Sequence, residues 1–157
     1  GKSEFQWGPE TGFIDTSHLE GIDGVVHLAG ENVASDRWTA EKKALIRDSR
    51  VDGTRLLSDA MAGLKQPPKV LVCASAIGYY GDRGDELLTE ESGPGTGFLA
   101  SVCREWEAAT TSAEQKGIRV VHLRFGMVLS PTGGAMAKLL PRSRRASEGC
   151  LGRGANM

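Results

Sequence analysis

The residues best suited to acid–base chemistry follow one apolar run of the sequence. Ser75 ends the run 69–75, and Tyr79 and Tyr80 come shortly after it. A hydroxyl and a phenol just beyond a strand could polarise a carbonyl oxygen or relay a proton. Neither group is acidic or basic enough near neutral pH without a neighbour that shifts it. The alternative is that the serine satisfies a turn and the tyrosines cover the edge of the core.

A second group of residues could lie against a flat ligand. Leu28, Ala29 and Gly30 close the apolar run 24–30. Ala29 and Gly30 carry almost no side chain, so a ligand could approach their backbone closely. The alternative is an ordinary turn from a strand into a helix.

Arg50 falls on an apolar seam, between Ile46 and Leu57, of the helix expected next. A guanidinium is costly to bury there unless an anion or a carboxylate pairs with it. Arginine suits planar or phosphate-bearing partners through its fork of N–H donors. In the alternative interpretation it extends to solvent or pairs with Asp48 or Asp52.

The other charged residues favour structural roles. The acidic residues between positions 82 and 91 do not have the spacing of a calcium loop and indicate a solvated loop. Arg142, Arg144 and Arg145 predict an exposed basic turn, with a phosphate contact as the alternative. His122 lies inside an apolar run and is expected to be a hydrogen-bonded core histidine. The wide spacing of the three cysteines and three histidines predicts no metal site and no disulfide framework, and favours a reducing, cytoplasmic setting.

Three apolar runs and two amphipathic stretches must position these residues. Their valine content and bounding glycines or prolines predict strands at 24–30, 69–75 and 118–129. Helical spacing predicts helices at about 39–65 and 98–116, the second with the seam Leu99, Val102, Trp106, Ala109 and Ala113. The remaining expectations are an irregular lead-in over 1–23, a long loop over 76–97, a short helix over 135–140 and a tail over 141–157.

The order of these elements predicts the fold class. Apolar runs without alternation indicate strands that are covered on both faces, as in a parallel sheet. Strands that alternate with helices therefore predict an α/β, Rossmann-like three-layer fold, in which ligands bind beyond the carboxyl ends of the strands.

The composition excludes several classes of protein. A chain of 157 residues, 39% hydrophobic and 25% charged, has the balance of one globular domain rather than of a disordered segment. No run approaches the roughly 18 apolar residues of a membrane span. The net charge of −1 argues against a nucleic-acid partner.

Five blocks of the sequence resemble the epimerase-family proteins of the extended short-chain dehydrogenase/reductase superfamily. These blocks are HLAGENVASDRWT, DSRVDGTRLL, ASAIGYYGDRGDELLTEES, FLASVCREWEAA and LRFGMVLSPTGGAM. The resemblance implies a Rossmann-type domain that binds NADP or NAD, with a slight preference for NADP. It assigns Leu28, Ala29, Gly30 and Arg50 to the cofactor. It places Ser75 and Tyr80 near a catalytic strand end, and residues 124–129 in a loop that closes over nicotinamide and substrate.

The sequence departs from the superfamily pattern in two ways. No strand with a glycine-rich turn precedes Gly24, so the resemblance implies a partial dinucleotide-binding domain over 1–157, with a βαβ unit missing at the front. The tail 141–157 would then begin the substrate-binding region. The Tyr-x-x-x-Lys pair is also absent, because Phe98 stands at or near the tyrosine position and no lysine follows four residues later.

The resemblance implies an NAD(P)-dependent oxidoreductase or epimerase-like enzyme. It would act on a small or sugar-derived carbonyl or alcohol, with Ser75 and either Tyr79 or Tyr80 polarising the substrate oxygen. One alternative is a dinucleotide-binding regulatory or partner protein without catalysis, and another is a structural domain without a ligand. A small-molecule substrate, no nucleic acid and no membrane are expected, and homo-oligomerisation stays open.

Overall fold

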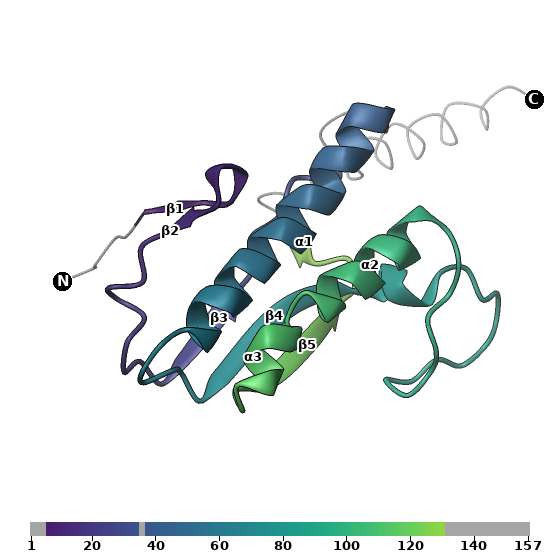
Figure 1. The fold of residues 1–157 in the computed structure, drawn as a ribbon. Helices are drawn as coiled ribbons and strands as arrows, with labels where there is room; N and C mark the ends of the chain where they lie inside the picture. Colours follow the sequence, from purple (N-terminus) through teal and green to yellow (C-terminus); the bar gives the residue numbers. More distant parts are fainter. Residues whose placement is uncertain (1–5, 35–36, 131–157) are drawn as a thin grey trace, which may run out of the picture. The chain divides into compact units, whose positions relative to one another are not determined.

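Three strands form the central sheet of the computed structural model, which describes residues 6–34 and 37–130. They are β3 (Gly24–His27), β4 (Val70–Ala76) and β5 (Arg119–Phe125), in the order β3-β4-β5. β3 and β4 are parallel and pair Gly24 with Val70 and His27 with Cys73. Figure 1 shows this parallel sheet with the helices packed along it. The predicted parallel α/β fold is confirmed. The carboxyl ends of the strands, where the site was expected, therefore lie at the same end of the sheet.

Two long stretches of helix connect the strands. α1 (Ala40–Ala62) begins after Thr39, whose hydroxyl accepts a hydrogen bond from the backbone N–H of Lys42 at 3.2 Å. The predicted helix over 98–116 is interrupted and forms α2 (Phe98–Ala108) and α3 (Thr111–Gln115). The interruption has a local cause, because the Thr110 hydroxyl donates to the carbonyl of Glu107 at 2.7 Å and competes with regular helical hydrogen bonding.

The core lies between the helices and one face of the sheet. Leu71 and Cys73 of β4 are fully buried beneath the helices. Ile46 and Met61 of α1 are fully buried as well. The opposite face was expected to be covered as well, yet Val26 is 66% exposed. Among the residues that the structure describes, all helices lie on one side of the sheet (Figure 1), so two of the three expected layers are seen.

The lead-in was predicted to be irregular, and this is wrong for residues 7–14. They form a short hairpin of β1 (Trp7–Gly8) and β2 (Phe13–Ile14), joined by the 3₁₀ helix η1 (Pro9–Thr11). Trp7 packs edge-on against His27, with ring centroids 5.4 Å apart. Gly53 of α1 lies against this indole, and a Cβ there would be in van der Waals contact with the Trp7 ring, at 3.4 Å. Single-sequence patterns did not reveal the hairpin because its strands are only two residues long.

Other expectations are met in part. The loop 76–97 begins with the 3₁₀ helix η2 (Ile77–Tyr80). Gly117, which follows α3, has a left-handed conformation, with φ of +89°. The chain divides into two compact units, 1–124 and 125–157, and the described part of the second ends with β6 (Leu129–Ser130). The predictions for 135–140, for the basic residues at 142–145 and for the tail lie outside the described residues.

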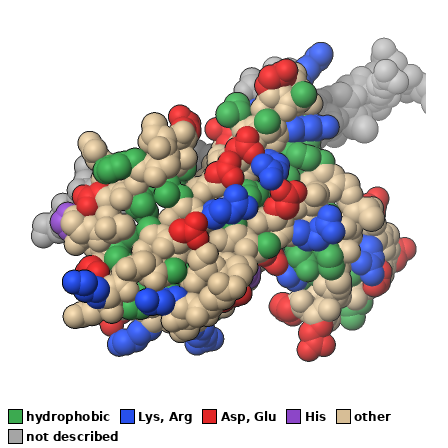
Figure 2. Space-filling view, viewed as in Figure 1, with side chains coloured by type: hydrophobic (Ala, Val, Ile, Leu, Met, Phe, Trp, Pro, Cys, Tyr) green, Lys and Arg blue, Asp and Glu red, His purple; other side chains and the backbone are tan. Residues whose placement is uncertain are grey.

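The surface seen in Figure 2 carries Lys and Arg interspersed with Asp and Glu over α1. Arg47 pairs with Asp48, and Arg55 pairs with Asp52. Charges of opposite sign therefore offset each other locally on this helix. None of the helices in the described part of the chain has the length and apolar character needed to cross a bilayer.

Candidate functional site

A partly buried carboxylate links the ends of β4 and β5. Ser75 at the end of β4 is 3% exposed, and its hydroxyl donates to Oε1 of Glu107 on α2 at 2.6 Å. Arg124 of β5 donates to both carboxylate oxygens of Glu107, through Nε and Nη2, at 2.9 Å each. Bidentate pairs of this kind combine a charge-assisted hydrogen bond with a fixed orientation. The carboxylate therefore holds the serine and the arginine in one arrangement.

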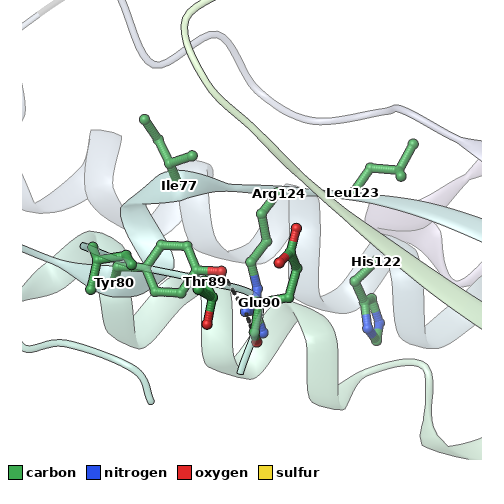
Figure 3. A pocket seen from close by; sticks show the side chains of 8 residues that line it. Ile77, Tyr80, Thr89, Glu90, His122, Leu123 and Arg124 are labelled. Carbon is green, nitrogen blue, oxygen red and sulfur yellow. Dashed lines mark hydrogen bonds between the residues drawn. The ribbon is translucent and has the colours of Figure 1, made fainter. Parts of the chain in front are cut away.

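Both predicted tyrosines contact the same guanidinium. Nη1 of Arg124 donates to the phenol oxygen of Tyr80 at 2.9 Å. The guanidinium carbon also lies 3.6 Å from the centroid of the Tyr79 ring. Figure 3 shows Tyr80 and Arg124 lying toward each other, with Glu90 close to them. Ser75, Tyr79 and Tyr80, which were selected from the sequence, are thus brought together through Arg124 and Glu107.

The charges of this cluster are stable near neutral pH. Burial alone would raise the pKa of Glu107, but the hydrogen bonds from Arg124 and Ser75 hold that pKa below its ordinary value. The hydrogen bond to Glu107 raises the pKa of Arg124. Neither group is therefore a proton carrier here. The Ser75 hydroxyl donates to Glu107. The phenol oxygen of Tyr80 accepts from Arg124, so the phenol O–H can donate a hydrogen bond to another group.

A cavity of about 520 Å³ lies beside Tyr80 and Arg124, and Figure 3 shows it from close by. Its lining includes Ile77 and Glu90 together with His122 and Leu123. The Nε2 of His122 lies 3.1 Å from the Thr110 hydroxyl, so this histidine is hydrogen-bonded as expected, but it is half-buried at the cavity and not in the core. Within this cluster, the phenol of Tyr80 is the group that could donate a proton to a ligand in the cavity.

At the end of β3, Arg50 lies against Gly30. A Cβ on Gly30 would be 3.1 Å from the Arg50 guanidinium carbon, so a larger residue there would displace this guanidinium by a few tenths of an ångström. Arg50 donates to the carbonyl oxygens of Ile46 and Glu31, at 3.1 and 3.0 Å. Its guanidinium carbon also lies 5.1 Å from the centroid of the Trp106 ring. Burial lowers the pKa of Arg50, which still leaves a cation at the strand end.

The alternatives considered for Arg50 are not what the structure shows. Asp48 binds Arg47, and Asp52 binds Arg55. The guanidinium is instead half-buried beside the loop that follows β3. That loop is anchored to α1, because the backbone N–H of Glu31 donates to the Ser49 hydroxyl at 3.0 Å. Leu28, another residue assigned to the cofactor, is 63% exposed.

Sequence reasoning missed Glu107. It falls four residues after Cys103, which is buried on α2, so helical spacing places it on the inner side of the helix. A carboxylate at such a position needs a cation, and Arg124 is the cation that tertiary folding supplies. Among the described residues, no group of three or more His, Cys, Asp or Glu side chains is arranged to hold a metal ion.

The sequence matches a family model over most of its length. The model describes the NAD dependent epimerase/dehydratase family and covers residues 12–150. An epimerase family protein of Mycobacterium bovis is 45% identical over 138 residues, which are 88% of this chain and 45% of that protein. A chloroplastic epimerase family protein of Arabidopsis thaliana is 39% identical over 87% of this chain and 39% of that protein. The chain thus spans less than half the length of these relatives.

Two solved structures share the fold at substantial identity. A nucleoside-diphosphate sugar epimerase from Corynebacterium glutamicum has a TM-score of 0.73 and 44% identity, over 85% of this chain and 28% of that one. The human epimerase family protein SDR39U1, isoform 2, was solved with NADPH. It has a TM-score of 0.71 and 32% identity, over 80% of this chain and 43% of that one.

Proposed function

This chain belongs to the NAD dependent epimerase/dehydratase family, and on that premise we propose that it forms part of the NAD(P)-binding domain of an oxidoreductase or epimerase-like enzyme. The substrate would be a small or sugar-derived carbonyl compound or alcohol. The observation that carries the proposal is the cluster at the strand ends, in which Tyr80 has a proton to donate and Arg124 holds its oxygen. The activity refers to the whole protein, since the relatives are about twice as long.

The residues at the end of β3 fit a nicotinamide dinucleotide. Gly30 has no side chain, and Arg50 places a guanidinium beside it. A guanidinium has five N–H donors, and the bonds to Ile46 and Glu31 leave donors for a ligand. Arg50 and the backbone of residues 28–30 would therefore hold the cofactor. The complex of the human relative with NADPH supports a nicotinamide cofactor, and NADP is our preferred form.

The proposed roles of the other residues follow from their contacts. When bound, the cofactor supplies or accepts a hydride at the substrate carbon. In the reducing direction, Tyr80 donates its phenol proton to the substrate oxygen, and Arg124 stabilises the negative charge left on the phenol oxygen. Tyr79 stacks on the guanidinium and limits its movement. Ser75 acts as a positioning residue, because its hydroxyl donates to the Glu107 carboxylate that orients Arg124.

A second candidate function is dinucleotide binding without catalysis. Phe98, which stands at or near the position of the superfamily's tyrosine, begins α2. Its ring packs edge-on against Trp38, with centroids 5.7 Å apart. A phenyl ring cannot donate a proton, so catalysis depends on Tyr80 or another acid.

Replacing Tyr80 with phenylalanine in the complete protein tests the proposal. We expect NADPH oxidation with a panel of aldehydes and ketones to fall by about 10²- to 10⁴-fold, because the general acid is lost. The dissociation constant for NADPH, measured by fluorescence titration, should stay the same, which shows that the variant is folded. Full activity of Tyr80→Phe would overturn the role of Tyr80. NADPH binding without turnover of any compound in the panel would favour the second candidate.

A further inference from the structure

A second hollow is lined in part by η2 and by the turn that follows it. It measures about 570 Å³ and is open to solvent, and its lining comes from three separate segments of the chain. Trp38 precedes α1, Gly78 and Gly81 flank the two tyrosines, and Phe98 and Leu99 belong to the first turn of α2. The volume is in the range of small-molecule sites, which is about 300–1,000 Å³.

We propose that this hollow is a substrate subsite that takes the uncharged, flat ring of a carbonyl compound. The inference rests on the proposed function and adds the substrate class to it. It is carried by the arrangement of Trp38 and Phe98 and by the charges of the lining.

Two aromatic rings form a corner in the hollow. The planes of Trp38 and Phe98 meet at 70°, with their centroids 5.7 Å apart. A flat ring that stacks on one of them would meet the other edge to face, and both arrangements are favourable for aromatic pairs. The indole N–H of Trp38 already donates to the carbonyl oxygen of Val33 at 2.8 Å. The indole therefore presents apolar surface rather than a hydrogen-bond donor to the hollow.

The charges of the lining disfavour an anionic ligand. Among the described residues that line the hollow, Asp82 is the one that is charged, and its carboxylate accepts from the backbone N–H of Gly84 at 3.1 Å. Arg83, the next residue, is engaged by both carboxylate oxygens of Glu86. Lys43 lies over the Phe98 ring, 5.4 Å from its centroid, but does not line the hollow. A diphosphate group would meet a carboxylate and no cation of the lining.

The hollow borders the turn that contains the proposed proton donor, since Gly78 and Gly81 belong to its lining. Gly81 has φ of +67°, and a Cβ there would lie 3.0 Å from the backbone of Thr96. The turn that follows Tyr80 is thus packed tightly against the segment leading into α2. Because Gly78 and Gly81 flank the two tyrosines in the sequence, a ring in the hollow lies next to the segment that carries the proton donor.

Binding of 2-naphthaldehyde to the complete protein, measured by calorimetry, tests the proposal. We expect Trp38→Ala to weaken binding about tenfold or more, because one wall of the corner is lost. Trp38→Phe should bind within about threefold of the original protein, because it keeps an aromatic ring. Thr96→Trp should abolish binding by filling the hollow, whereas Leu87→Trp, at a 90% exposed position of the same loop, should not.

Competition experiments identify the occupant. UDP-glucose and NADPH should not displace 2-naphthaldehyde. Displacement by UDP-glucose would assign the hollow to a nucleotide sugar, displacement by NADPH would assign it to the cofactor, and either result would overturn the proposal. Unchanged binding by both Trp38→Ala and Thr96→Trp would also overturn it. Tyr80→Phe should lower turnover without abolishing 2-naphthaldehyde binding, so loss of the proton donor's role and loss of the subsite are separate outcomes.

Discussion

The Glu107 carboxylate is the residue on which the arrangement of the strand-end cluster depends. Its side chain is 13% exposed, and it accepts from Ser75 and from two nitrogens of Arg124. A buried charge that loses its partner is strongly destabilising, because neither water nor another ion replaces the lost interaction. The cluster therefore contributes to stability as well as to the proposed function.

Replacing Glu107 with glutamine should lower the free energy of unfolding by about 1.5–3 kcal/mol, because Arg124 loses a charged acceptor. Glu105→Gln is the matched control on the same helix. Glu105 binds Arg47, and the side chains are 39% and 43% exposed. That substitution should cost about 1 kcal/mol or less. Urea denaturation measures both variants, and equal losses would show that the Glu107 pair is no stronger than a surface pair.

His27 should make stability depend on pH. It is buried, its Nε2 lies 3.0 Å from the Thr54 hydroxyl, and burial lowers its pKa below the ordinary 6.5. Below about pH 6.5 the unfolded chain binds a proton that the folded chain does not, so stability should fall as the pH is lowered from 7.5 to 5.5. This decrease should be smaller in His27→Gln than in the original protein. Urea midpoints across this pH range provide the measurement, and an unaltered decrease in His27→Gln would contradict the assignment.

At the scale of elements, local hydrogen bonds determine where the helices begin and end. Thr39 caps α1, and the Thr110 hydroxyl interrupts the second helical stretch. The interruption has a consequence for packing, because the backbone N–H of Ala113 in α3 donates to the Ser58 hydroxyl of α1 at 2.9 Å. A continuous helix would change the direction of α3 and place this contact elsewhere.

Thr39→Ala should lower the free energy of unfolding by about 1 kcal/mol, since the N–H of Lys42 loses its acceptor. Thr39→Ser should restore most of the loss, because serine is an equally good N-cap residue. Thermal unfolding followed by circular dichroism measures both variants. Equal stability of the original protein and Thr39→Ala would mean that water caps this helix as well as threonine does.

At the scale of the whole described structure, the two faces of the sheet differ sharply. Leu71 is fully buried beneath the helices, whereas Val26 is 66% exposed on the opposite face. Side chains alternate between the faces of a strand, so neighbouring apolar residues of one run have different environments. The apolar composition of a strand therefore does not indicate how deeply each of its residues is buried.

In this 157-residue chain, Leu71→Ala should cost about 2–5 kcal/mol, because it leaves a cavity in the core. Val26→Ala should cost about 0.5 kcal/mol or less, since substitutions at exposed sites have small effects. Urea denaturation compares the two variants. A large loss for Val26→Ala would show that this face is covered in solution.

Much of the fold follows from patterns along the chain. The apolar runs at 24–30 and 69–75 and the helical spacing over 39–65 predicted elements that the structure contains, with ends displaced by a few residues. Parallel pairing followed from the order of strands and helices. Such features depend on local hydrophobic periodicity and on the connection rules of α/β proteins, which a single sequence expresses directly.

The partners of the site residues were decided by tertiary structure alone. The sequence pointed to Ser75, Tyr80 and Arg50, but not to Glu107 as the acceptor of Ser75 or to backbone carbonyls as acceptors of Arg50. The Ser75–Glu107 and Arg50–Glu31 contacts join residues that are 32 and 19 positions apart in the chain, and the first depends on where α2 packs on the sheet. A hydrogen bond is a matter of ångströms and angles, whereas a sequence pattern specifies only residue type and spacing.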